Sequence, residues 1–122
     1  MDTRVAVVSL WAEDVSALAH FYQEVIGLRL ASYQHERPHF KLGNCYLTIL
    51  KGRSVPPQNA VPEHFPLIAL AVGDLDAAIQ RLQTHAIEMP WGIQRDSDSR
   101  WVMFYDPAGN LIELVEFKQS SN

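Results

Sequence analysis

The amino-acid sequence predicts an α+β fold built from two copies of one βαβββ module. Three observations support this prediction: a repeat sixty residues apart, an apolar strand followed by a capped helix in each half, and turn signals between shorter strands. A chain of 122 residues matches one domain of roughly 100–200 residues. We therefore expect a single domain over 1–122, with module one at about 4–51, a connector at 52–66 and module two at about 67–118.

The repeat begins with an apolar run that ends in an aspartate. Val7–Asp14 precedes the first helical pattern, and Leu67–Asp74 precedes the second. Each run is short and rich in β-branched or small apolar residues, as strands are. Asp14 and Asp74 can each accept a hydrogen bond from the free N–H groups of a helix's first turn. We therefore predict, in each half, a strand followed by a helix with an aspartate at its N-cap.

Each predicted helix has one apolar stripe at i, i+3, i+4 and i+7 spacing: Leu18, Phe21, Tyr22 and Val25, then Leu75, Ala78, Ile79 and Leu82. Gly27 ends the first helix. Three strands should follow each helix: Leu28–Tyr33, Pro38–Leu42 and Cys45–Lys51, then Ile87–Met89, Arg100–Tyr105 and Leu111–Phe117. Turns are expected at Gly43-Asn44, at Asp96–Ser99 and at Asp106–Asn110.

Composition excludes several classes of partner. The net charge is −4, without the clustered Lys/Arg stripe that attracts nucleic acid or anionic lipid. The longest apolar runs reach about eight residues, whereas a membrane span needs about twenty. The single cysteine, Cys45, cannot form an intrachain disulfide. We expect a cytoplasmic protein whose partners include neither nucleic acid nor membrane.

The opening strand of each half is apolar on both faces. Val7 and Trp11 point away from the face that the first helix covers, and Leu67 and Ala71 do the same in the second half. Because one helix covers only one face, the other half, a second copy of the chain or a ligand must cover the second face. A cleft lined by strands is the simplest solution.

The order of elements and several short motifs resemble the glyoxalase, bleomycin-resistance protein and extradiol dioxygenase superfamily, also called vicinal oxygen chelate. The motifs are Ala12-Glu13-Asp14, Val72-Gly73-Asp74, Phe21-Tyr22 with Gly27-Leu28, Pro90-Trp91-Gly92, and Asp106-Pro107-Ala108-Gly109-Asn110-Leu111-Ile112-Glu113-Leu114. The resemblance implies paired modules that form a U-shaped mixed sheet around a cleft, with the helices on the outer face. It also implies a small-molecule ligand and a homodimer.

In the enzymes of this superfamily, a divalent metal is bound by His, Glu or Gln on the first and last strands of each module. The matching positions are Val7 and Thr48, or Leu47 if the register slips by one, and then Leu67 and Glu113. Valine and leucine offer no lone pairs, and one carboxylate does not complete a catalytic metal site. We therefore expect no metal ion held by the protein and no cofactor.

The histidines do not offer an obvious replacement site. His35 and His39 have the i, i+4 spacing that places two ligands together on a helix, but Pro38 disfavours a helix there. On a strand, the two rings would lie about 13 Å apart. We interpret them as surface or pocket-rim residues.

Aromatic residues are the remaining candidates for ligand contact. Trp11 continues one face of the first strand, Trp91 lies between a proline and a glycine, and Trp101 and Tyr105 share a strand face. Such residues suit a planar or aromatic ligand, although packing in the core or at a dimer interface would explain them too. Thr48, Arg100 and Glu113 complete the candidate ligand-binding set, with Arg100 either contacting an anion at the pocket mouth or simply solvated.

Three functions of different classes remain open. The first is a metal-free protein that sequesters or carries a planar or aromatic molecule. The second is an enzyme that uses Glu113 as a general base, without a metal or with one that the substrate brings. The third is a regulatory or structural module with a vestigial pocket. Glu113 either has a raised pKa in an apolar cleft or pairs with Arg100, which would lower its pKa.

Overall fold

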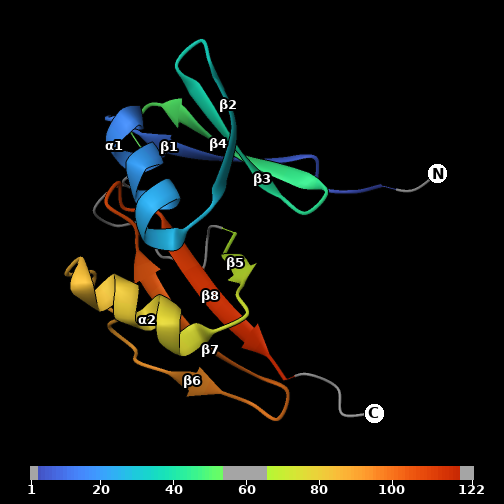
Figure 1. Ribbon diagram of the computed structural model, residues 1–122, viewed down its shortest axis with the longest axis vertical. Helices are drawn as coiled ribbons and strands as arrows, with labels where there is room; N and C mark the ends of the chain where they lie inside the picture. Colours follow the sequence, from blue (N-terminus) through green and yellow to red (C-terminus); the bar gives the residue numbers. More distant parts are fainter. Residues whose placement is uncertain (1–2, 54–65, 119–122) are drawn as a thin grey trace. The chain divides into compact units, whose positions relative to one another are not determined.

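Each half of the chain forms its own four-stranded mixed sheet with helical residues on one face (Figure 1). The computed structural model describes residues 3–53 and 66–118. The chain divides into two compact units, residues 1–56 and 57–122. The α+β class and the repeated module are confirmed.

The first unit contains β1 (Val7–Ala12), α1 (Val15–His20), the π-helix η1 (Phe21–Ile26), β2 (Arg29–Gln34), β3 (Arg37–Leu42) and β4 (Cys45–Lys51). Its sheet has the order β1-β4-β3-β2. The β1 strand runs parallel to β4, and the other pairs are antiparallel. The expected strand at Cys45–Lys51 is confirmed in full.

The second unit contains β5 (Ile68–Ala71), α2 (Leu75–Thr84), β6 (Gln94–Arg95), β7 (Ser99–Tyr105) and β8 (Leu111–Phe117). Its sheet repeats the topology of the first, with the order β5-β8-β7-β6 and a parallel pair formed by β5 and β8. None of the helices in the described ranges is long and apolar enough to cross a membrane.

Both helix caps follow the prediction. The Asp14 carboxylate accepts a hydrogen bond from the backbone N–H of Ala17 at 3.0 Å. The Asp74 carboxylate accepts one from the backbone N–H of Ala77 at 3.1 Å. These bonds satisfy donors that a helix leaves free at its first turn.

The first helix differs from the prediction because it is not α-helical throughout. It continues from α1 into the π-helix η1, in which Phe21, Tyr22, Val25 and Ile26 are all buried. The Tyr22 ring lies 6.4 Å from that of Phe40 on β3, between centroids, so this segment packs against the sheet. Gly27 ends the helix with a positive φ of 87°, as expected.

The expected strand at Ile87–Met89 is wrong. The backbone N–H of Ile87 donates to the carbonyl of Leu82 at 2.9 Å, and Ala86 adopts a positive φ of 58°. This hydrogen bond and the turn at Ala86 close the C-terminal end of α2. The Ile87 N–H is therefore not available for pairing with a strand. The strand that completes the second sheet is instead the two-residue β6, in which Gln94 pairs with Trp101 and Arg95 pairs with Arg100, both on β7.

The core of each unit lies between its sheet and its helix. In the first unit, the buried strand residues include Leu10, Phe40, Leu47 and Ile49. In the second unit, they include Val102, Phe104, Ile112 and Leu114. Because side chains alternate along a strand, the residues between these positions point to the opposite face of each sheet, which we call the helix-free face.

Candidate functional site

The helix-free face of the second sheet brings together several of the predicted site residues. Trp101, Met103 and Tyr105 alternate with the buried residues of β7. Met103 lies directly opposite Glu113 on β8, and Ala69 of β5 lies opposite Glu113 on its other side. The candidate acid therefore lies opposite Met103, which Trp101 and Tyr105 flank on the same strand face.

Glu113 is half-buried between neighbours that carry no charge. Desolvation raises its pKa above the ordinary value of 4.5. Within the described residues, the Glu113 carboxylate has neither a hydrogen bond nor an ion pair. A carboxyl group with a raised pKa can keep its proton and donate a hydrogen bond, or act as a base.

The aromatic side chains of the second unit differ in how firmly they are held. The indole N–H of Trp101 donates to the side-chain oxygen of Gln94 at 3.1 Å, which fixes the ring between β6 and β7. The rings of Trp91 and Tyr105 lie 6.2 Å apart between centroids and are tilted by 51°. Trp91 and Tyr105 remain 46% and 42% exposed, so they can still contact another molecule.

Arg100 lies on the other face of the same sheet. Its guanidinium donates to both carboxylate oxygens of Asp76, at 3.1 and 2.9 Å, and to Glu116 at 2.8 Å. These contacts lower the pKa of Asp76 and of Glu116 and raise that of Arg100 further. Arg100 thus joins α2 to β7 and β8, and it does not pair with Glu113.

The first sheet places Thr48 on its helix-free face, between Ser9 of β1 and His39 of β3. Thr48 is buried, and its hydroxyl donates to the carbonyl of Pro38 at 2.8 Å. Leu47 is buried on the helix side, so of the two residues expected at the family's metal-ligand position, Thr48 is the one on the helix-free face.

Trp11 is half-exposed on the same face of the first sheet, next to the end of β4. A Cβ atom added at Gly52 would lie 2.7 Å from Cε3 of Trp11. The absence of a side chain at Gly52 therefore gives the Trp11 indole ring room to pack there.

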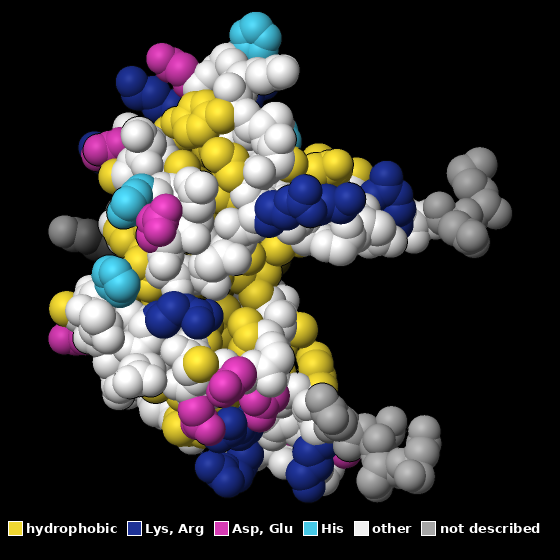
Figure 2. Space-filling view, viewed as in Figure 1, with side chains coloured by type: hydrophobic (Ala, Val, Ile, Leu, Met, Phe, Trp, Pro, Cys, Tyr) yellow, Lys and Arg dark blue, Asp and Glu magenta, His cyan; other side chains and the backbone are white. Residues whose placement is uncertain are grey.

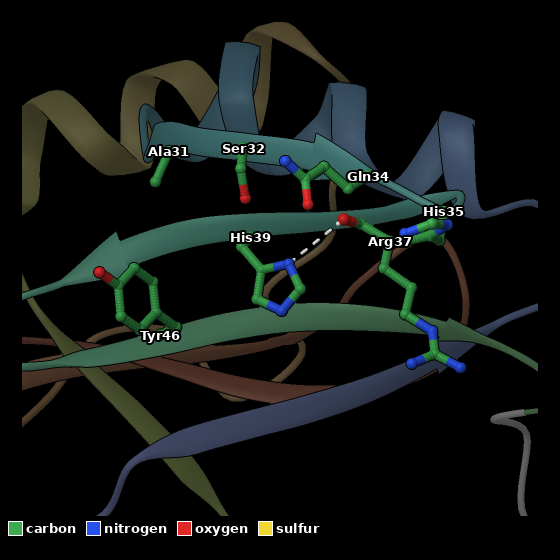
Figure 3. Close-up of a pocket in the computed structure, with 7 residues that line it drawn as sticks. All are labelled: Ala31, Ser32, Gln34, His35, Arg37, His39 and Tyr46. Atoms are coloured by element: carbon green, nitrogen blue, oxygen red, sulfur yellow. Dashed lines mark hydrogen bonds between the residues drawn. The ribbon is translucent and has the colours of Figure 1, made fainter.

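A pocket of about 600 Å³ opens on the outer strands of the first sheet (Figure 3). Its lining comes from β2, β3, β4 and the turn between β2 and β3: Ala31, Ser32, Gln34, His35, Arg37, His39 and Tyr46. Both histidines line it, which agrees with their interpretation as pocket-rim residues. Their grouping with Arg37 was not predicted, although the i, i+2 spacing of Arg37 and His39 places both on one face of a strand.

Metal ligands do not gather on either sheet. Among residues 3–53 and 66–118, no group of three or more His, Cys, Asp or Glu side chains is placed to hold a metal ion. The positions that match the family's ligands hold Val7, Thr48, Leu67 and Glu113, and the cross-strand partners of Glu113 are Ala69 and Met103.

Comparison with known proteins agrees with this architecture. A family model described as the Glyoxalase/Bleomycin resistance protein/Dioxygenase superfamily matches residues 4–114. The uncharacterized protein YaeR of Escherichia coli K12 is 29% identical over 119 residues, which cover 89% of this chain and 92% of that protein.

Two solved structures share the fold. TnmS3, an antibiotic binding protein from Streptomyces sp. CB03234, is 24% identical with a TM-score of 0.76, over 96% of this chain and 98% of that chain. Lactoylglutathione lyase from Agrobacterium tumefaciens is 24% identical with a TM-score of 0.70, over 94% of each chain. The fold thus occurs in a binding protein and in an enzyme, and the resemblance found in the sequence is confirmed. The chain belongs to the glyoxalase/bleomycin resistance protein/dioxygenase superfamily.

Proposed function

We propose that the protein is a small-molecule binding protein that holds a planar or aromatic ligand against the helix-free face of the second sheet, without a metal ion of its own. The observation that carries this proposal is the position of Glu113 beside Met103, with Trp101 and Tyr105 flanking Met103 on the same strand face. Aromatic rings offer flat contact area to a planar molecule, and the thioether of Met103 offers a polarizable one.

Glu113 supplies the polar contact that an apolar site needs in order to orient a ligand. Because desolvation raises its pKa, the carboxyl group favours the protonated form more than an exposed glutamate does. A protonated carboxyl can donate to a carbonyl or ring nitrogen of the ligand. The ligand class that fits is therefore an aromatic molecule with a hydrogen-bond acceptor at its edge.

The residues present do not fit the divalent metal that enzymes of the superfamily hold. A catalytic metal needs several nitrogen or oxygen ligands that converge on one point. Ala69 has no donor atom, Met103 offers only a soft thioether, and Val7 and Leu67 are apolar. We derive no chemical step through a metal for this chain.

An enzymatic function is the second candidate, and the raised pKa of Glu113 favours it. A carboxylate with a raised pKa is a stronger base than an ordinary glutamate, so Glu113 could remove a proton from a bound substrate. TnmS3 and lactoylglutathione lyase do not decide between the two functions, because at 24% identity they show the fold alone.

We also propose that the protein acts in the cytoplasm as a homodimer. Val7, Trp11 and Leu67 are 47%, 47% and 44% exposed, and burying such side chains in a second copy would stabilise the pair. Sedimentation at micromolar concentration should give about twice the chain mass of 13.8 kDa. A single species at the monomer mass would contradict the dimer.

Ligand binding can be tested by tryptophan fluorescence with a panel of planar aromatic compounds. The wild type should bind at least one of them saturably. Tyr105→Ala should weaken that binding about two- to ten-fold, the usual range for losing one aromatic contact. Tyr33→Ala is the matched control, because Tyr33 is 47% exposed on a strand of the other unit.

The same panel separates the two candidate functions. If the bound compound is recovered unchanged and Glu113→Gln alters only its affinity, the binding function stands. Chemical conversion of the compound that is lost in Glu113→Gln would favour the enzyme. No saturable response to any compound, or equal losses in Tyr105→Ala and Tyr33→Ala, would contradict the proposed site.

A further inference from the structure

We propose that the pocket on the helix-free face of the first sheet is an anion-binding site, which recognises a phosphate or carboxylate group of a small molecule. Its lining residues carry a guanidinium, two imidazoles, a phenol, a hydroxyl and an amide. None of them carries a carboxylate. The proposal concerns the first unit alone and does not depend on the aromatic ligand proposed for the second sheet.

The positive charge extends along the strands around the pocket. Arg37, His39 and Lys41 alternate with the buried Pro38 and Phe40, so they share the helix-free face of β3. Lys41 lies directly opposite Arg29 of β2. Figure 2 shows Lys and Arg side chains gathered over the β3 region. Several cations around one pocket attract an anion even before a direct contact forms.

The acidic side chains described in the first unit do not line the pocket. The Glu13 carboxylate pairs with Arg53 at 3.3 Å, and the Asp14 carboxylate caps α1. Glu24 lies in η1. Glu36 lies in the turn between β2 and β3, exposed and outside the lining. The charge of this pocket is therefore not neutralised by a lining carboxylate.

The His39 ring is oriented by its own strand. Its Nδ1 lies 3.2 Å from the carbonyl oxygen of Arg37 (Figure 3). Since a carbonyl only accepts, the proton on that side must belong to Nδ1. A neutral ring then offers only a lone pair at Nε2, whereas a protonated ring offers a second N–H donor. An anion would therefore be bound best by the protonated form.

Among the residues that the structure describes, the side chains that face His39 include no carboxylate that would compete for this donor. Ser32 faces it from β2, Thr48 and Tyr46 from β4, and Arg37 and Lys41 from its own strand. In Figure 3, the His39 ring lies between β3 and β4, and the side chains of Ser32 and Gln34 extend from β2 toward β3. Their hydroxyl and amide groups can donate further hydrogen bonds to an oxyanion.

The turn between β2 and β3 keeps His35 in the lining through an unfavourable backbone conformation. His35 and Glu36 have positive φ angles of 55° and 58°, in the left-handed region that favours glycine. A two-residue hairpin turn needs this geometry at both positions. Because neither position is a glycine, the turn carries the His35 imidazole, which lines the pocket.

The test uses sulfate as the probe, because its charge does not change between pH 5 and 8, and follows backbone amide shifts by NMR. Saturable shifts should centre on Ser32, His39 and Tyr46. Arg37→Gln should weaken binding about ten-fold, as expected for one charge-assisted contact. Lys51→Gln is the matched control: it removes one exposed charge from β4, at a position that pairs with the buried Ala12 on the helix side.

The pH dependence is the second readout. Because imidazoles commonly gain a proton as pH falls from 8 to 5, the wild type should bind sulfate more tightly at pH 6 than at pH 8. His35→Asn combined with His39→Asn should remove most of this difference. The proposal is overturned if shifts do not saturate, if they spread over all cationic surfaces, or if Lys51→Gln weakens binding as much as Arg37→Gln.

Discussion

Glu113 is the residue on which the functional interpretation depends most. It is half-buried between Ala69 and Met103, and desolvation is the cause that raises its pKa. The sequence left open whether Glu113 is a desolvated acid or the partner of Arg100. The structure favours the first account, because Arg100 binds Asp76 and Glu116 on the opposite face.

The raised pKa of Glu113 gives a signed prediction for Glu113→Gln. A folded protein that holds this proton more tightly than the unfolded chain loses stability as pH rises from about 4.5 through the folded-state pKa. Glutamine does not ionise, so the variant should gain stability relative to the wild type across that interval. Thermal unfolding of both proteins at pH 4 and pH 8 measures this difference. A variant that loses relative stability as pH rises would show that Glu113 is a stabilising anion.

Local hydrogen bonds hold the turn between β7 and β8 in its conformation. Asp106 is 4% exposed. Its carboxylate accepts hydrogen bonds from the backbone of Ala108 and Asn110 at 3.0 and 2.9 Å, and also from the Asn110 amide. Gly109 completes the turn with a φ of 92°. The first five residues of the family motif at Asp106–Leu114 thus form a structural turn, and the rest of the motif lies on β8.

Asp106→Ala should destabilise the protein by about 2 kcal/mol, because two part-buried backbone N–H groups would lose their acceptor. Pro107→Ala serves as the control: Pro107 is exposed and donates no hydrogen bond, so its loss should cost less than about 1 kcal/mol. Urea unfolding of the two variants measures both values. Equal destabilisation by the two substitutions would contradict the role given to the Asp106 carboxylate.

The ion pairs of Arg100 connect the start of α2 to the sheet beneath it. Glu116 contributes twice, because one carboxylate oxygen accepts from Arg100 and the other from the backbone N–H of Leu75 at 3.0 Å. The pKa values of Asp76 and Glu116 lie below their ordinary values of 3.8 and 4.5 for this reason.

Arg100→Gln should lower the unfolding temperature at pH 7. Carboxyl groups with lowered pKa values stabilise the fold above about pH 4.5, and this contribution is lost as pH falls through their folded-state pKa values. The difference in unfolding temperature between variant and wild type should therefore shrink in acid. Thermal unfolding at pH 7 and near pH 3 tests this. The NMR titration of Glu113 should be unchanged in the variant, and a shifted Glu113 midpoint would contradict the separation of the two groups onto opposite faces.

The elements that the sequence predicted well are those with local signals. Asp14 and Asp74 cap their helices because an aspartate before an apolar stripe needs only its own neighbours to do so. The π-helix and the absence of a strand at Ile87–Met89 depend on hydrogen bonds that apolar spacing does not reveal. The pocket around His39 was missed because it requires the register of three strands.

At the scale of the whole molecule, the two units share one topology but differ in charge. Residues 3–53 contain six Lys and Arg against four Asp and Glu, whereas residues 66–118 contain four against eight. The repeat therefore conserves the arrangement of strands and helix while the helix-free faces have diverged. Both carry aromatic residues, but the first also carries Arg37, His39 and Lys41, whereas the second carries Glu113. Such a division suits a ligand-binding chain whose two faces recognise different chemical groups.

We propose that the protein binds a small organic molecule without holding a metal ion of its own. A native mass spectrum of the freshly purified protein tests both halves of this proposal, because bound metal and bound ligand each add mass. We expect no equimolar Zn, Ni, Fe or Mn, together with a retained organic molecule or a free chain that takes up an aromatic compound from the panel. One equivalent of a divalent metal on the protein alone, abolished by Glu113→Gln, would overturn the proposal.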